Sequence, residues 1–358
     1  MSITGNILID KLRINISLAE LDKIGLKTED YKKKIRNTLE KYFINKNAYS
    51  VTTAYNYIRI TLTPTRFKPN NNGYYSDTNL EMPSESWLLN IFEDLEFDRK
   101  ELNKTVSIVW IHLTKNILTE KSPSIYIKFL SNYPLKKGFI HSLISSNRHN
   151  TSLRIATPKQ KTQTRDFIGD RAFIFYDKVQ ELLDKSNKNG VYLKSPLTKP
   201  EIKAISTHGG WYKPESNFLR IGGLNLLRSE LQYKYKNKIA SLQHFLNPKS
   251  QSDSLTMDTM LNLLKKQELY SKLNEFFTQE LTSVIFYKAP TQEKTHLSSY
   301  QRAFANLITN NDIVDLQLVY DSLELGHIFK RNATKFYSGN NSLYSELYQK
   351  LILQSFST

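Results

Sequence analysis

The sequence of 358 residues contains no cysteine. This absence excludes disulfide bonds, thiolate metal sites and a cysteine nucleophile, so histidine, aspartate and glutamate are left as metal ligands. No run of 18 or more apolar residues occurs, and the first residues lack the basic and then apolar order of a signal peptide. We therefore expect a soluble protein of the cytoplasm with no membrane partner.

A phosphate-binding loop of the GxxxxGK[ST] type is also absent. Neither Gly138 nor the pair Gly209–Gly210 is followed by one. A nucleotide bound in such a loop is therefore not expected as a cofactor.

Acidic residues are scarce in one part of the chain. The formal net charge is +16, and residues 101–240 hold 24 basic and 10 acidic residues, whereas the two flanking segments are nearly balanced. A basic excess confined to one segment favours an anionic partner, with nucleic acid first and an acidic membrane surface second. The alternative is solubility combined with a compositional bias toward lysine and asparagine, but the neutral C-terminal third argues against a bias of the whole chain.

Hydrophobic periodicity separates a strand-rich part from a helical part. Alternating or continuous apolar runs predict strands, and apolar spacings of three and four predict helices. The predicted strands are 7–16, 55–63, 106–114, 172–175 and two segments within 218–235, hinged at Gly222–Gly223. The predicted helices are 19–43 with an irregularity near Gly25, 84–95, 178–188, 255–273, 275–286, 298–309, 313–323 and 342–353.

Two further segments have patterns that do not define a single type of secondary structure. Residues 124–130 are read as strand or loop, and residues 144–167 as a polar stretch unsuited to the core. Together the patterns predict an α+β fold: a catalytic domain on an antiparallel sheet over residues 1–245, then a mainly helical C-terminal region over 246–358. The expected linker is 246–250.

One tyrosine follows an apolar strand in the basic segment. The sequence RAFIFYDKVQ at 171–180 delivers Tyr176 directly before Asp177 and Lys178. Strand geometry would place Tyr176 and Lys178 on one face, a phenol beside an ammonium group. The alternative is that Tyr176, one of 21 tyrosines, packs its ring against a helix with its hydroxyl at the surface.

Several stretches, taken in order, resemble a known family. They are IRITLTPTRF at 58–67, SESWLLNIFEDL at 84–95, SIVWIHLT at 107–114, FIFYDKVQEL at 173–182 and LLRSELQYKY at 226–235. Together they are similar to the replication initiator of filamentous phages, the gene-two protein. This is a rolling-circle nicking and joining endonuclease related to the His-hydrophobic-His superfamily. The resemblance spans about residues 1–240 and rests on the order and spacing of the stretches.

The resemblance implies roles for four residues. Tyr176 would be the nucleophile that keeps a 5′-phosphotyrosine, and Lys178 its basic neighbour. His112 and Glu230 would bind Mg²⁺ or Mn²⁺, although the family usually has Arg-x-Asp where this chain has Trp110–His112. The alternatives are a hydrogen-bonded core histidine for His112 and a cross-strand ion pair for Glu230.

The chemistry of a phenol nucleophile is consistent with a basic neighbour and a bound metal ion. The tyrosine hydroxyl has a pKa near 10, so it is mostly protonated at neutral pH and needs a cation or a metal beside it. A divalent ion held by a carboxylate and an imidazole would polarise the scissile phosphate. Because a phosphotyrosine bond keeps the energy of the broken phosphodiester, rejoining requires no nucleotide cofactor.

Basic side chains near the candidate nucleophile suit contacts with DNA phosphates, with tyrosines available to stack on unpaired bases. The alternatives are a solvated loop at 147–165 and a lysine-protected strand edge at 233–238. The candidate DNA-binding residues are Arg148, Arg154, Lys159, Lys161, Arg165, Arg228, Lys234 and Lys236.

The resemblance therefore implies nicking of one strand of a double-stranded origin, attachment through Tyr176 and rejoining of the displaced single strand. The element would be a filamentous phage, a prophage or a small plasmid, and a host helicase is a candidate partner; the oligomeric state stays open. Two alternatives remain, namely a plasmid mobilisation relaxase and a DNA-binding protein that has lost catalysis.

Overall fold

An antiparallel sheet organises the part of the chain that the structure, a computed structural model, describes. The described residues are 6–43, 48–66, 84–131, 133, 135–136, 138–147, 150–157, 171–181, 210–212, 218–220, 225–234, 236–285 and 340–352. Within them the sheet has nine strands, all paired antiparallel. In spatial order they are β2 (Tyr49–Ala54), β3 (Tyr57–Leu62), β1 (Ile7–Ser17), β4 (Val106–Leu118), β10 (Leu226–Lys234), β7 (Arg171–Asp177), β6 (Asn150–Ala156) and β5 (Ile140–Asn147), with the short β11 (Leu255–Thr256) paired to β4.

The remaining described elements are a second, two-stranded sheet and a set of helices. The small sheet pairs β8 (Gly210–Tyr212) with β9 (Phe218–Arg220). The helices are α1 (Leu18–Lys23), α2 (Thr28–Tyr42), α3 (Glu85–Asp94), α4 (Lys100–Thr105), α5 (Pro123–Ser131), α8 (Lys236–Leu246), α9 (Met257–Lys265), α10 (Leu269–Val284) and α14 (Asn340–Leu351). Helices and an antiparallel sheet in one chain make the fold α+β, as predicted.

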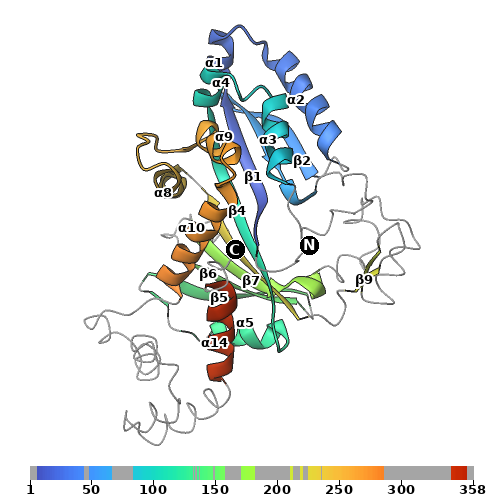
Figure 1. Cartoon of the computed structure of the whole chain (residues 1–358), viewed down its shortest axis with the longest axis vertical. Helices are drawn as coiled ribbons and strands as arrows, with labels where there is room; N and C mark the ends of the chain where they lie inside the picture. The colour runs from blue at the N-terminus through green and yellow to red at the C-terminus, as the bar shows by residue number, and fades with distance from the viewer. Residues whose placement is uncertain are drawn as a thin grey trace, which may run out of the picture.

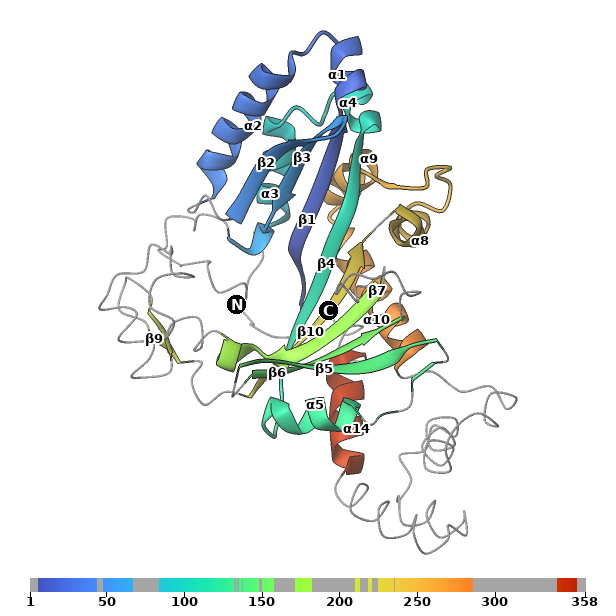
Figure 2. The ribbon, with the colours of Figure 1, turned by 180° about the vertical axis from the view of Figure 1, so that it is seen from behind.

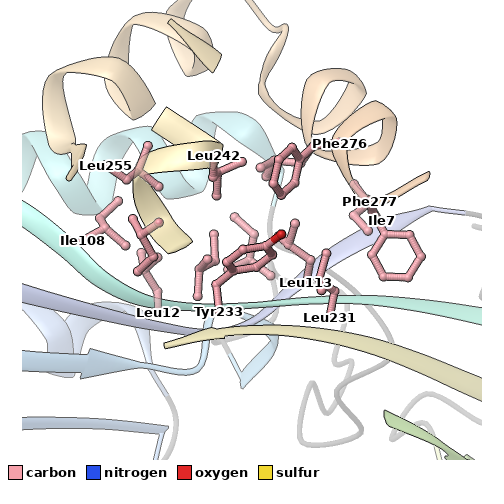
Figure 3. Packing of buried hydrophobic residues seen from close by; sticks show 14 of the residues in the cluster. Ile7, Leu12, Ile108, Leu113, Leu231, Tyr233, Leu242, Leu255, Phe276 and Phe277 are labelled. Carbon is pink, nitrogen blue, oxygen red and sulfur yellow. The ribbon is translucent and has the colours of Figure 1, made fainter. Parts of the chain in front are cut away.

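The core lies between one face of the large sheet and the helices. Helices α9, α10 and α14 lie in front of the strands in Figure 1 and behind them in Figure 2. Figure 3 shows the side chains that meet at this interface: Leu12, Leu113, Leu231 and Tyr233 from the sheet, and Leu242, Leu255, Phe276 and Phe277 from residues 236–285. Each fully buried leucine or phenylalanine contributes about 1.5–3 kcal/mol. Because strand side chains alternate, the positions between these residues face the other side of the sheet.

The strongest periodic segments fold as predicted. The first, third and fourth predicted strands are β1, β4 and β7, and the helix predicted after Pro83 is α3, with Ser84 at its N-cap. The irregularity expected near Gly25 separates α1 from α2, where Gly25 has a φ of +73°. That backbone conformation is open to glycine at little cost.

Two interpretations of short segments are wrong. Residues 124–130 belong to α5, whose Tyr126, Ile127 and Leu130 are buried at helical spacing. The polar stretch at 144–167 contains parts of the hairpin β5–β6, and Leu153 and Ile155 of β6 are fully buried. The first segment is a short apolar run, which periodicity alone does not assign to helix or strand, and the second has few apolar residues.

The described C-terminal helices differ from the prediction mainly in the position at which one helix ends and the next begins. The chain leaves the helical conformation between α9 and α10 at Gln267, which has a φ of +58°, and not near residue 274. Helix α14 matches the helix predicted at 342–353, while those predicted at 298–309 and 313–323 lie outside the described residues. Within the described ranges no helix has the length and apolar character needed to cross a membrane.

Elements on both sides of residue 245 share the same hydrophobic cluster. Strand β11 pairs with β4 through Leu255 and Ile108. Helix α14 is attached to β4 by Lys115, whose Nζ donates a hydrogen bond to the carbonyl oxygen of Leu351 at 3.3 Å. The domain boundary at 245/246 stays a prediction, and the residues expected as a linker form a turn after α8.

Candidate active site

Three neighbouring strands, β7, β10 and β4, align polar side chains on the sheet face opposite the hydrophobic core. Their register fixes three cross-strand rows. Listed from β7 through β10 to β4, the rows are Tyr176–Arg228–Asn116, Ile174–Glu230–Thr114 and Ala172–Gln232–His112. Residues directly opposite or diagonal across neighbouring strands are within reach of long side chains. The candidate nucleophile, both proposed metal ligands and one predicted DNA-binding arginine therefore meet on one surface.

The hydroxyl group of Tyr176 is held by a carboxylate and a guanidinium group. It donates a hydrogen bond to Oε1 of Glu230 at 2.6 Å, and Nη1 of Arg228 donates to the phenol oxygen at 3.5 Å. The other carboxylate oxygen of Glu230 accepts a hydrogen bond from Nε2 of Gln232 at 3.2 Å. The phenol is thus paired with a proton acceptor and lies beside a permanent cation.

Arg228 is anchored by two groups, one from the adjacent strand β4 and one from β1, the strand beyond it. Its Nε donates to Oδ1 of Asn116 at 2.8 Å, and its Nη1 lies 3.8 Å from Oδ1 of Asp10. Asp10 occupies a β-bulge in β1 at the register shift between Ile9 and Lys11. The Arg228 side chain is only 1% exposed. Arg228 is therefore buried beside the phenol, and its role in DNA binding stays a prediction.

Burial and charge set the protonation of the site. Burial, together with the carboxylates of Glu181 and Glu230, raises the pKa of Tyr176 well above its usual value, although the nearby Arg228 opposes the shift. Burial, with Asp10 next in size, also raises the pKa of Glu230. Tyr176 is consequently a neutral phenol at physiological pH. A carboxylate with a raised pKa is a stronger base and is better suited to accept the phenol's proton.

Lys178 lies beyond the end of the strand. Strand β7 ends at Asp177, whose Oδ1 accepts a hydrogen bond from the backbone N–H of Gln180 at 3.0 Å, and Lys178 begins a helical turn. The Lys178 side chain is 1% exposed, and its Nζ lies 2.5 Å from Oε2 of Glu181. Lys178 is thus paired with Glu181, one of the carboxylates that raise the pKa of Tyr176. The cation beside the phenol oxygen is Arg228.

His112 shares the predicted face with Trp110 and Thr114. Its side chain is 4% exposed, and its ring meets that of Trp110 edge to face, with 4.7 Å between centroids. In the register His112 lies opposite Gln232, one row away from Glu230. In the part of the chain that the structure describes, no three His, Asp or Glu side chains are grouped to hold a metal ion.

The other predicted DNA-binding residues are only partly described. Arg154 lies on β6 opposite Ile174 and thus faces the same side as Tyr176. Lys234 ends β10 and Lys236 begins α8, but their side chains are not among those described. The rest lie outside the described residues: Arg148, Lys159, Lys161 and Arg165.

A second tyrosine, Tyr233 of β10, has polar partners similar to those of Tyr176 but a different environment. Tyr233 donates a hydrogen bond to Oε2 of Glu280, which also accepts from Nη1 of Arg171 at 2.5 Å. Its ring packs against Phe276 with 5.6 Å between centroids, on the helix-covered face shown in Figure 3. Tyr233 is 1% exposed, whereas Tyr176 is only partly buried. Of these two phenols, Tyr176 is the more exposed.

Two participants in the site could not be identified beforehand. Asp10 and Lys11 are both polar within ILIDKL at 7–12, so the pattern does not single out Asp10. Strand alternation places Gln232 on the face of Arg228 and Glu230, but nothing in the sequence indicates its hydrogen bond to Glu230.

Comparison with known proteins gives limited information. No model of a protein family matches the sequence, and the search of curated proteins finds no match. Among solved structures the chain is similar to a rolling circle replication initiator protein from Geobacillus stearothermophilus, with a TM-score of 0.33 and 10% identity. That match covers 86% of this chain and 98% of the other. A TM-score below 0.5 does not establish a common fold, so the interpretation of the site rests on its own residues.

Proposed function

We propose that the protein initiates rolling-circle replication by nicking one strand of double-stranded DNA at a specific origin. Tyr176 is the nucleophile, and the 5′ end of the nicked strand stays attached to it as a phosphotyrosine. The observation that carries the proposal is the pairing of the Tyr176 hydroxyl with the carboxylate of Glu230 beside Arg228. The basic excess around this site and the resemblance to phage initiators support DNA as the substrate.

The nicking step follows from the contacts of the phenol. Oη of Tyr176 attacks the phosphorus atom of a phosphodiester, and its proton passes to Glu230. The new O–P bond replaces the bond from phosphorus to the 3′-oxygen, which leaves and takes up a proton from solvent. General-base assistance of this kind typically contributes 10²- to 10⁴-fold in rate. It is needed here because the raised pKa of Tyr176 leaves almost no phenolate at neutral pH.

Arg228 supplies the permanent positive charge of the step. As Tyr176 loses its proton, negative charge grows on the phenol oxygen, which lies 3.5 Å from Nη1 of Arg228. Asn116 and Asp10 fix the guanidinium group before the reaction, so little reorganisation is required when that charge develops.

Rejoining is the reverse reaction. A free 3′-hydroxyl attacks the phosphotyrosine, Tyr176 is the leaving group, and Glu230 returns the proton to the phenol oxygen. The number of phosphodiester-type bonds is unchanged, so no nucleotide is consumed. The displaced single strand would leave as a closed circle, and a host helicase that separates the strands remains a candidate partner.

The proposed metal ligands do not form a complete site as they are arranged. Both oxygens of Glu230 accept hydrogen bonds, from Tyr176 and from Gln232, and His112 lies one row away from Glu230, opposite Gln232. Mg²⁺ and Mn²⁺ require several oxygen or nitrogen ligands around one point. We therefore derive no step through a metal ion. A requirement for Mg²⁺ or Mn²⁺, with His112 and Glu230 as ligands, stays a prediction from the family resemblance.

Metal removal tests that prediction. EDTA is expected to stop nicking, and Mn²⁺ or Mg²⁺ to restore it. If His112 binds the ion, His112→Ala raises the metal concentration needed for half-maximal nicking by about 10-fold or more. His244→Ala is the matched control, because His244 is exposed on α8. Nicking that persists in EDTA, or an unchanged metal dependence of His112→Ala, rules out this role.

The proposed function is tested by trapping the covalent intermediate. Supercoiled DNA of the replicon that encodes the protein is incubated with the full chain and Mg²⁺ or Mn²⁺, and then denatured. We expect nicked circles that carry protein on a 5′ end, and peptide mapping should place the adduct at Tyr176. A nick in a transfer origin would instead identify a mobilisation relaxase. DNA that binds without being nicked would identify a binding protein.

A further inference from the structure

Arg154 occupies a position on the site face that none of the described contacts explains. It lies on β6 directly opposite Ile174 of β7, and Tyr176 is the next residue of β7 on the same face. Arg154 and Tyr176 are therefore diagonal neighbours across two adjacent strands, a separation that long side chains span. On the outer side of β6, Arg154 lies opposite Ser142 of the edge strand β5.

The guanidinium group of Arg154 is partly buried with unused donors. Among the described residues, Nε and Nη2 have no hydrogen-bond partner, although both atoms are buried. The neighbour Ile174 is apolar, and Glu230, the next residue of this row, already accepts hydrogen bonds at both oxygens. Burial lowers the pKa of Arg154 below its usual value.

Other arginines of these strands differ in this respect. Arg228 is held by Asn116 and Asp10, and Arg171 by Glu280 and the ring of Phe139. A buried charge without a partner destabilises a folded protein. Arg154 therefore has the character of a residue whose partner arrives from outside. The planar fork of a guanidinium group matches the oxygens of a phosphate, with two parallel hydrogen bonds.

We infer that Arg154 binds a phosphate group of the DNA strand next to Tyr176. The inference rests on the proposed function for the identity of the strand, and it names the group that positions the strand at the nucleophile. The phosphate oxygens accept hydrogen bonds from the donors of Arg154, and the strand then crosses the face of β7 at the phenol. Arg228 remains the positive charge beside the phenol oxygen, and Arg154 supplies the positive charge that binds the DNA backbone.

Binding measurements test this without any knowledge of the origin. The probe is a single-stranded oligothymidine of about 20 nucleotides, longer than the site size of typical single-strand binders. Anisotropy titrations of the full chain give affinity against salt concentration. Loss of one phosphate contact lowers the slope of log K against log salt by about 0.7. We expect this change for Arg154→Met, with about 10-fold weaker binding, and no change for the control Arg99→Met, whose side chain is half exposed on α4's N-terminal side.

Thermal unfolding without DNA separates ligand binding from a structural role. A buried guanidinium group whose Nε and Nη2 have no partner among the described residues is expected to cost stability, so Arg154→Met should leave the melting temperature unchanged or raise it by about 2 °C. Arg154→Lys keeps the charge but not the fork, and it should retain the salt slope with weaker binding. If the methionine variant fails to fold, Arg154→Lys takes its place in the binding and unfolding measurements. A lower melting temperature for both variants would mean that protein groups hold Arg154, and would overturn the inference.

Uncharged linkages in the DNA test whether the phosphate that Arg154 binds lies beside Tyr176. Once the nicked sequence is known, a single methylphosphonate is placed at each linkage around it. We expect the wild type to lose affinity at one linkage at or next to the nick, and Arg154→Met to be insensitive there. Equal losses in both proteins, or an unchanged salt slope of Arg154→Met, would overturn the inference. If the wild type binds through Arg154 but nicks no DNA, the proposed function fails while the phosphate site stands.

Discussion

Replacement of Tyr176 by phenylalanine is expected to abolish both nicking and the covalent adduct. The variant keeps the ring and loses only the attacking oxygen, so binding of DNA should persist. Removal of a covalent nucleophile costs about 10⁴-fold or more in rate, which places the variant below the detection limit of a plasmid assay. The measurement is the fraction of supercoiled DNA that is nicked, with denaturing gels to detect protein attached to DNA.

The chain provides a matched control in Tyr233. Tyr233→Phe also removes a phenol that donates to a glutamate beside an arginine, but on the helix-covered face of the sheet. We expect this variant to nick at the wild-type rate. Tyr176→Phe leaves Oε1 of Glu230 without the hydrogen bond of the phenol, at a cost of about 1–3 kcal/mol. In Tyr233→Phe the oxygen of Glu280 keeps the hydrogen bond from Arg171, so a smaller cost is expected. Denaturant unfolding measures both. Adduct formation by Tyr176→Phe, or its loss in Tyr233→Phe alone, would reject Tyr176 as the nucleophile.

The strands of the site could be predicted because each carries a strong local pattern. Strands β1, β4 and β7 are apolar runs that local periodicity identifies, and β10 alternates Arg228, Glu230 and Gln232 with buried residues. Alternation fixes which side chains share a face. It does not fix which strands are neighbours. The family resemblance brought Tyr176, His112 and Glu230 into one proposal, and the register now gives their actual rows.

Other features of the site depend on the tertiary structure. Asp10 reaches Arg228 because a bulge shifts the register of β1 against β4, and a bulge leaves no reliable mark in a single sequence. Strand alternation predicts Lys178 beside Tyr176, but β7 ends at Asp177 and the helix predicted from residue 178 begins there. The lysine pairs with Glu181. The arginine assigned to DNA is buried because three strands contribute its partners.

Replacement of Glu230 by glutamine is expected to lower the rate of nicking by about 10²- to 10⁴-fold, the contribution of a general base. Glutamine has the shape of glutamate, and its carbonyl oxygen still accepts the hydrogen bond of Tyr176. Gln232 can turn its amide so that its own oxygen faces the new amide group. The substitution therefore removes the proton acceptor and keeps the geometry. Glu280→Gln, at the analogous pair with Tyr233, is the control and should nick normally.

The pH dependence of nicking distinguishes a base from a structural carboxylate. Glu230 acts only when ionised, and its pKa lies above the ordinary value because of burial and Asp10. Wild-type nicking should therefore fall on acidification at a higher pH than an ordinary glutamate would give, and level off above that pKa. Glu230→Gln depends on phenolate formed in advance, so its rate should instead rise about tenfold per pH unit up to the pKa of Tyr176. Parallel profiles for the two proteins would show that Glu230 only positions the phenol, and that the proton goes elsewhere.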